Sequence, residues 1–240
     1  MTPANGIRLE GLVKHYRTGG GTVRAVDGID LVVEPASSVA ITGPSGCGKS
    51  TLLGLIGGLE APTRGRVLLG ELEISQLPER QRARARRERI GFMFQSDDLL
   101  PFLTAAENVA LQLALRGGDD DPDRSRGLLA DVGLAEHADK LPDQLSGGQR
   151  QRVGMARALV HRPSVILADE PTGELDSATS KVVIDLLLAA QRQMDATLLV
   201  VTHDPEVARR LDRTMRLRDG RLVDGLTATV SEGEGEPANA

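Results

Sequence analysis

Aromatic side chains are scarce in this sequence: of its 240 residues three are Phe, one is Tyr and none is Trp. Modules that bind single-stranded nucleic acid stack the bases on aromatic side chains. The composition therefore argues against a protein of that class. It also predicts an aliphatic core, because hydrophobic residues still make up 40% of the chain.

The sequence also has little cysteine, no net positive charge and no long hydrophobic run. Cys47 is the only cysteine, which excludes an intrachain disulfide and suits a reducing compartment. The formal net charge of -5 gives no general attraction to nucleic acid or anionic lipid. No apolar run approaches the roughly 20 residues of a membrane-spanning helix, and residues 1–10 lack the layout of a signal peptide. We therefore expect a cytoplasmic protein that reaches a membrane only through a partner.

What is present is a pattern of alternating β and α segments. Residues 7–33 alternate like antiparallel strands around a glycine-rich tip. The aliphatic runs expected as buried parallel strands are residues 39–42, 90–94, 165–168 and 198–202. We expect one α/β domain over residues 1–225, with a helical subdomain inserted at about 97–160, and a tail at 226–240 whose composition predicts disorder.

A glycine-rich segment follows the first of those aliphatic runs. Its residues are Gly43, Pro44, Ser45, Gly46, Cys47, Gly48, Lys49 and Ser50, with Thr51 next. Between a strand and a helix, this G-x-x-x-x-G-K-[ST] pattern predicts a phosphate-binding P-loop rather than a merely tight turn. Lys49 would then reach the β- and γ-phosphates of ATP, and the Ser50 hydroxyl would ligate Mg²⁺.

Two acids end the aliphatic run at 165–168. The carboxyl end of a parallel strand beside a P-loop is a site for a metal ion and an attacking water. Asp169 would hold Mg²⁺, directly or through water, and Glu170 would take a proton from the water or polarise it. Taken alone, the pair also fits an ordinary acidic turn.

A second anion-binding pattern opens a later helix and consists of Leu145, Ser146, Gly147, Gly148 and Gln149. Two glycines and a serine at a helix N-terminus present N–H groups and a hydroxyl to an anion. Between the P-loop and the acidic strand, this segment resembles the signature of the ABC ATPases, and the resemblance covers about residues 7–225. It implies a P-loop NTPase fold with a RecA-like core, an N-terminal antiparallel β-subdomain and the inserted helical subdomain.

The resemblance also implies an ATPase with ATP and Mg²⁺ as cofactors, whose signature closes on the ATP of a partner in a homodimer or a pair of related chains. It implies four further roles. Tyr16 resembles the aromatic that stacks on adenine, and Gln95 the Q-loop glutamine that reaches Mg²⁺ and the attacking water. Asp176 belongs to a D-loop at the dimer interface, and His203 resembles the switch histidine that contacts the γ-phosphate. Taken alone, His203 would be interpreted as a core histidine.

Several segments resemble one branch of the family, the LolD, MacB and FtsE type: residues 43–46, 56–59, 89–92, 99–101, 103–109 and 170–173. That branch implies a separate integral membrane permease, driven by mechanotransmission for lipoprotein release or macrolide export, with the ATPase peripheral on the inner face of the membrane. Two alternatives remain: a non-transport ABC ATPase of DNA repair or translation, and an FtsE-like regulator of cell-wall hydrolases.

The remaining basic groups are expected at the surface. The arginine-rich run at 80–89 predicts a solvated helix face rather than a nucleic-acid contact, because it lacks aromatics and Glu88 interrupts it. His15, His137 and His161 lack a functional placement and are expected at the surface. No nucleic-acid partner is expected.

Overall fold

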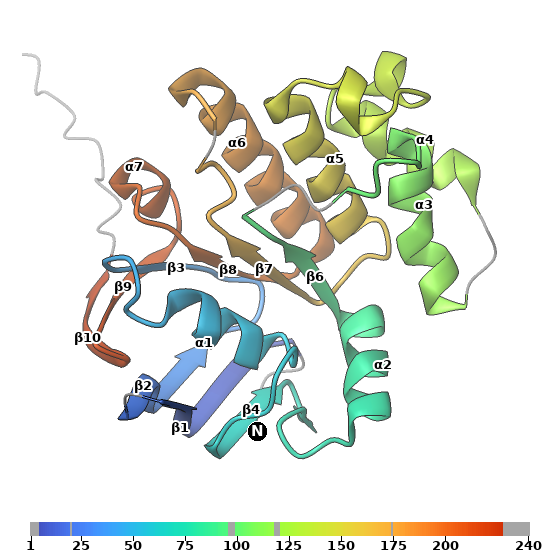
Figure 1. Cartoon of the computed structure of the whole chain (residues 1–240). Helices are drawn as coiled ribbons and strands as arrows, with labels where there is room; N and C mark the ends of the chain where they lie inside the picture. The colour runs from blue at the N-terminus through green and yellow to red at the C-terminus, as the bar shows by residue number, and fades with distance from the viewer. Residues whose placement is uncertain (1–4, 20, 96–98, 118–120, 174, 228–240) are drawn as a thin grey trace, which may run out of the picture.

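The computed structural model describes residues 5–19, 21–95, 99–117, 121–173 and 175–227, and their strands form two sheets (Figure 1). The first sheet is antiparallel, in the order β2-β1-β4-β5. Its strands are β1 (Ile7–Thr18), β2 (Gly21–Val33), β4 (Arg64–Leu69) and β5 (Leu72–Glu73). This is the predicted N-terminal β-subdomain, and two strands after the P-loop helix complete it.

The second sheet has the order β10-β9-β3-β8-β7-β6. Its strands are β3 (Ser38–Thr42), β6 (Ile90–Met93), β7 (Val165–Asp169), β8 (Thr197–Val201), β9 (Arg213–Arg218) and β10 (Arg221–Thr227). Five of them run parallel, and β10 pairs with β9 in the antiparallel sense. The register places Met93 of β6 opposite Ala168 of β7, and Ala168 opposite Val200 of β8. The carboxyl ends of these strands therefore meet at one edge of the sheet.

Helices cover both faces of the second sheet. They are α1 (Lys49–Ile56), α2 (Glu79–Arg89), α3 (Ala105–Arg116), α4 (Pro122–Asp131), α5 (Gly147–Leu159), α6 (Ser177–Met194) and α7 (Pro205–Ala208), with short 3-10 turns η1 (Ala135–His137) and η2 (Pro142–Gln144). Helix α1 lies between the two sheets, whereas α5 and α6 lie on the opposite face (Figure 1). The elements described between residues 99 and 160 are all helical, as expected for the inserted subdomain.

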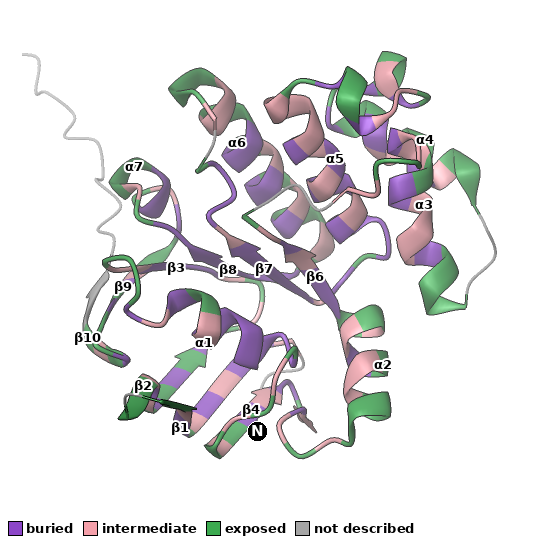
Figure 2. Ribbon diagram, in the orientation of Figure 1, coloured by how far each residue is buried: buried purple, intermediate pink, exposed green. Residues whose placement is uncertain are grey.

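Apolar packing fixes this arrangement. Leu52, Leu53 and Ile56 of α1 are completely buried, because the helix contacts a sheet on either side. On the other face, Val153 of α5 and Leu187 of α6 belong to a second buried cluster. Figure 2 shows buried residues along both helices. The core is aliphatic, as the shortage of aromatics predicts.

The C-terminal hairpin forms as its Asp-Gly turn predicts: Asp219 and Gly220 both have positive φ, 50° and 74°. Strand β10 continues to Thr227, so Leu226 and Thr227 belong to the sheet and not to the predicted tail. Residues 228–240 lie outside the described residues. Within the described part of the chain, no helix has the length and apolar character needed to cross a bilayer.

Candidate active site

The glycine-rich loop joins β3 to α1 and is built by close backbone contacts. Gly48 has φ of 104°, and a Cβ atom there would lie 2.0 Å from the carbonyl oxygen of Ala25. Lys49 is nearly buried, and its Nζ donates to the carbonyl oxygens of Gly43 at 2.9 Å and Pro44 at 3.1 Å. The loop therefore curls around the ammonium group at the N-terminus of a helix, where an anion binds favourably.

A cavity of about 620 Å³ opens beside this loop. The predicted nucleotide residues that line it are Tyr16, Gly46, Cys47, Gly48, Lys49, Ser50 and Thr51. The hairpin turn at Asp219 and Gly220 and the β2 residues 23–25 line it as well. A cavity of this size suits a small-molecule ligand. Sequence reasoning missed the hairpin and β2, because both reach the cavity only through tertiary packing.

Asp169 at the end of β7 faces the P-loop helix. The Ser50 side chain hydrogen-bonds its carboxyl group, while the Oδ1 atom of Asp169 is buried without a partner. Burial raises the pKa of the Asp169 carboxyl, and the Ser50 hydroxyl opposes this shift. A buried carboxylate oxygen without a donor, beside a hydroxyl, fits a hard divalent cation.

The next residue, Glu170, is held by the following strand. It is nearly buried, and its Oε2 atom lies 2.9 Å from Nδ1 of His203, whose ring is largely exposed. The backbone N–H of His203 also donates to this oxygen at 3.3 Å. The two predicted catalytic groups therefore form a hydrogen-bonded pair across the ends of β7 and β8.

Gln95 lies at the same edge of the sheet, because the strand that precedes it, β6, pairs in register with β7. It is exposed and lies two residues beyond the end of β6, whose Met93 pairs with Ala168. Its position in the chain thus corresponds to that of Glu170 on the neighbouring strand. The Q-loop residues that follow, 96–98, lie outside the described residues.

The signature segment forms the N-terminus of α5. Ser146 caps the helix: its Oγ accepts from the N–H of Gln149 at 3.3 Å, and its own N–H donates to Gln149 Oε1 at 2.8 Å. Leu145 is buried, which anchors the turn in front of the cap. The N–H groups of Gly147 and Gly148 are then the first ones at the open end of the helix. No residue of 145–149 is among the described residues that line the P-loop cavity.

Asp176 is the N-cap of α6. Its carboxylate accepts from the N–H groups of Ala178 and Thr179, both at 3.0 Å, and from the Thr179 hydroxyl at 2.7 Å. These hydrogen bonds, the Thr179 hydroxyl first, lower the pKa of Asp176. The predicted D-loop consists of residues 173–176, and Glu174 lies outside the described residues.

The prediction of surface histidines is wrong for His161. Its side chain is buried because the end of α5 packs on β6, where Nε2 contacts the carbonyl oxygen of Ile90 at 3.1 Å. Burial lowers the pKa of His161 to about 4. His137 is half-buried, and its Nε2 lies 2.8 Å from Nε2 of the signature residue Gln149. His15 is half-buried too and pairs with Asp27.

The arginine-rich helix α2 is only partly the solvated face that we expected. Arg84 is exposed and pairs with Glu88, as expected. Arg82 and Arg86 instead lie against the domain, and both contact Glu79. Arg86 also donates to the carbonyl oxygen of Gly58.

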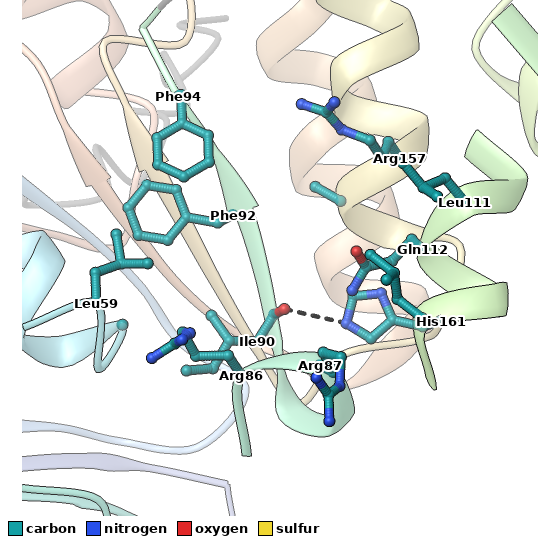
Figure 3. A pocket seen from close by; sticks show the side chains of 13 residues that line it. Leu59, Arg86, Arg87, Ile90, Phe92, Phe94, Leu111, Gln112, Arg157 and His161 are labelled. Atoms are coloured by element: carbon teal, nitrogen blue, oxygen red, sulfur yellow. Dashed lines mark hydrogen bonds between the residues drawn. The ribbon is translucent and has the colours of Figure 1, made fainter. Parts of the chain in front are cut away.

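A second cavity, of about 320 Å³, lies between α2, β6 and the helical subdomain (Figure 3). Its apolar lining includes Leu59, Phe92, Phe94, Leu111 and Leu115, and its cationic lining is Arg86, Arg87 and Arg157. The rings of Phe92 and Phe94 stack with centroids 4.2 Å apart.

The sequence profile of the ABC transporter family matches residues 26–173, which include the P-loop, the signature and the acidic strand end. The chain belongs to the ABC transporter family. It is an ATP-binding and ATP-hydrolysing subunit, and the resemblance drawn from the motifs is confirmed.

Relatives of known name agree with the branch. The lipoprotein-releasing system ATP-binding protein LolD of Legionella pneumophila (strain Lens) is 46% identical over 213 residues, 88% of this ABC chain and 94% of the relative. The macrolide export ATP-binding/permease protein MacB of Syntrophobacter fumaroxidans is 44% identical over 218 residues, 89% of this chain and 30% of that longer protein.

A solved structure agrees with the fold. The ATP-binding cassette MJ0796, in a dimeric post-hydrolysis state bound to ADP and Pi, matches with a TM-score of 0.87 at 38% identity. The match covers 92% of this ABC chain and 98% of that chain. The predicted ABC ATPase fold is therefore confirmed.

Proposed function

We propose that this ATPase works as a homodimer, or as a pair with a related chain, around two Mg-ATP, and drives a separate membrane permease of the lipoprotein-release or macrolide-export type. The observation that carries the proposal is one edge of the parallel sheet, which gathers the P-loop, Asp169 and the Glu170–His203 pair. The LolD and MacB relatives support the choice of permease.

Nucleotide binding starts at the P-loop. Lys49 exchanges its bonds to the carbonyls of Gly43 and Pro44 for oxygens of the β- and γ-phosphates, at little cost because the ammonium group is already desolvated. At the far end of the cavity, Tyr16 stacks on the adenine.

Mg²⁺ fits between Ser50 and Asp169, since the Oδ1 atom of Asp169 is buried and lacks a partner. Ser50 and Asp169 would hold the ion there, and it would supply positive charge against the phosphates during phosphoryl transfer. Gln95 lies at the same edge of the sheet and would contact the metal ion and the attacking water.

Glu170 is the general base. Its carboxylate takes the proton of the water that attacks the γ-phosphate, and the P–O bond to ADP breaks as the new one forms. His203 holds Oε2 of this carboxylate by a side-chain and a backbone contact, and its exposed ring can also reach the γ-phosphate.

A second chain completes the site. The signature at Ser146–Gly148 does not line the P-loop cavity of its own chain, so its N–H groups and hydroxyl would face the ATP of a partner. The dimeric state of MJ0796 supports this arrangement. Asp176, at the start of α6, belongs to the same interface in this proposal.

The permease docks at the hollow beside Phe92 and Phe94. The exposed side chains of Arg87, Leu59 and Leu115 suit an amphipathic cytoplasmic segment that carries an acidic residue. The hollow contacts β6, the strand that leads to Gln95, so docking there is coupled to the nucleotide site. The ATPase is then peripheral on the inner face of the membrane.

Copurification tests the proposal. Glu170→Gln with ATP should trap the closed dimer with its partner, and a permease with few membrane helices should be recovered from gently solubilised membranes. Recovery of nucleic acid or ribosomes instead would favour a repair or translation ATPase, and recovery of a regulator of cell-wall hydrolases would favour the FtsE-like alternative.

Two matched substitutions test the docking site. Leu59→Glu places a charge in the hollow at a residue that is 45% exposed, and Val182→Glu places one on α6 at a residue that is 47% exposed. We expect the first to release the permease while basal ATP hydrolysis continues, and the second to retain it. Equal retention by both variants would contradict the assignment of the hollow.

A further inference from the structure

Tyr16 is tied to the segment that follows the P-loop helix. Its hydroxyl donates to Glu60, with Oε1 at 2.7 Å and Oε2 at 2.8 Å. Glu60 lies just beyond the end of α1, the helix that begins at the P-loop. The segment that follows the P-loop helix therefore holds the tyrosine hydroxyl.

Lys14 completes the cluster on β1. Its Nζ lies 2.7 Å from Glu60 Oε2, donates to the carbonyl oxygen of Ala61 at 2.7 Å, and stands 5.1 Å from the centroid of the Tyr16 ring. Burial first, and then the hydrogen bond to the Glu60 carboxylate, raises the pKa of the Tyr16 hydroxyl. The ring thus has a cation on one side and a fixed hydroxyl.

The backbone of β1 is held by the same loop. The N–H of Thr63 donates to the carbonyl oxygen of Val13 at 2.8 Å, and its hydroxyl accepts from the N–H of His15 at 3.0 Å. The segment around Tyr16 is thereby fixed against residues 60–63 by backbone and side-chain contacts together.

The cluster of Lys14, Tyr16 and Glu60 lies at one side of the P-loop cavity. The P-loop cavity is lined by Tyr16 and Thr51, and neither Lys14 nor Glu60 is among the described residues that line it. The groups that hold the ring therefore stand outside the cavity, and the ring is presented to it.

We propose that Glu60 is a positioning residue for nucleotide recognition: it holds the Tyr16 hydroxyl and the Lys14 ammonium so that the tyrosine ring is fixed for stacking on the purine base. The inference rests on the proposed role of Tyr16 at the adenine. A ring that is already ordered loses less conformational freedom on binding, so the effect falls on affinity for the base and not on the phosphates.

The test compares ATP with inorganic tripolyphosphate, which occupies the P-loop but has no base. Glu60→Ala and Tyr16→Phe should each weaken ATP binding about three- to tenfold, the range that one hydrogen bond gives. The double variant should be no weaker than Glu60→Ala alone, because Glu60→Ala already removes the contact that Tyr16→Phe removes. Affinity for tripolyphosphate should stay constant, and KM for ATP should change more than kcat.

Two further variants sharpen the result. Glu60→Gln keeps an acceptor for the Tyr16 hydroxyl and should restore most of the ATP affinity. Glu10→Ala removes another paired carboxylate of β1, one bound to Arg66 outside the cavity, and should leave ATP affinity unchanged.

Additive losses in the double variant, a parallel loss of tripolyphosphate binding, or unchanged ATP affinity in Glu60→Ala would each overturn the inference. Failure of the proposed function looks different: Tyr16→Ala would then bind ATP as tightly as the wild type, or the wild type would not hydrolyse ATP.

Discussion

The Nδ1 atom of His203 lies 2.9 Å from Oε2 of Glu170, and the backbone N–H of the same histidine approaches this oxygen to 3.3 Å. The two residues follow neighbouring parallel strands, β7 and β8, so the sheet itself sets the distance between them. A nearly buried carboxylate is thereby oriented by a largely exposed ring. In the proposed mechanism, this contact fixes the base before water attacks.

His203→Ala removes the side-chain contact and keeps the backbone contact. We expect kcat for ATP hydrolysis to fall by about 10²-fold or more, because an oriented electrostatic contact at the reacting groups is lost. The Kd for ATP should stay within about threefold of the wild-type value. Steady-state kinetics and equilibrium binding would measure both, and an unchanged kcat would remove His203 from the mechanism.

The two signature glycines should differ in their tolerance of alanine. A Cβ atom at Gly148 would lie 2.6 Å from Cγ2 of Thr179, whose hydroxyl is bound to Asp176 and cannot turn away freely. At Gly147 the nearest such atom is Arg150 Nη2, 3.8 Å away.

Thermal unfolding should therefore show Gly148→Ala destabilised by about 1–3 kcal/mol, the range for overpacking. Gly147→Ala should be neutral or stabilised by up to about 1 kcal/mol, because alanine favours helix. Equal melting temperatures for the two variants would contradict the close contact between Gly148 of α5 and Thr179 of α6.

The buried His161 should make stability depend on pH. Burial lowers its pKa from the ordinary 6.5 to about 4, so the unfolded chain binds a proton that the folded chain does not. Stability is fully present above pH 6.5 and is lost as the pH falls towards 4, by up to about 3 kcal/mol.

Denaturant unfolding of the wild type and His161→Gln between pH 7.5 and about 4.5 would measure this loss, since the variant lacks the titrating group. We expect the wild type to lose stability more steeply with acid, and the difference between the two proteins to change with pH. Parallel curves would mean that His161 is not held neutral by the fold.

The roles proposed for the site residues come from local patterns, whereas contacts distant in sequence form the surroundings of the site. The P-loop and the Asp169–Glu170 pair are short segments whose strand and helix context can be read directly. Glu60 lies 44 residues from Tyr16, and no local pattern connects them. The burial of His161 cannot be predicted from local sequence. Its contact with Ile90 spans 71 residues and depends on how α5 packs on β6.

The sequence predicts the type of fold more completely than the exact ends of its strands and the positions of its motifs relative to one another. Residues 226 and 227 were assigned to a tail on composition, although they pair with β9. The resemblance already implied that Ser146 acts on the ATP of a partner, and the structure agrees in that Ser146 does not line the P-loop cavity of its own chain.

The central claim is that two copies of this chain close around ATP and that Glu170 hydrolyses it. Glu170→Gln, mixed with Mg²⁺ and ATP, should lose hydrolysis by about 10²- to 10⁴-fold, the usual contribution of a general base. By light scattering after size exclusion, the same sample should have twice the monomer mass, and Ser146→Arg in that background should return it to the monomer. An ATP-loaded Glu170→Gln protein that stays monomeric, or that hydrolyses ATP at the wild-type rate, would contradict the account.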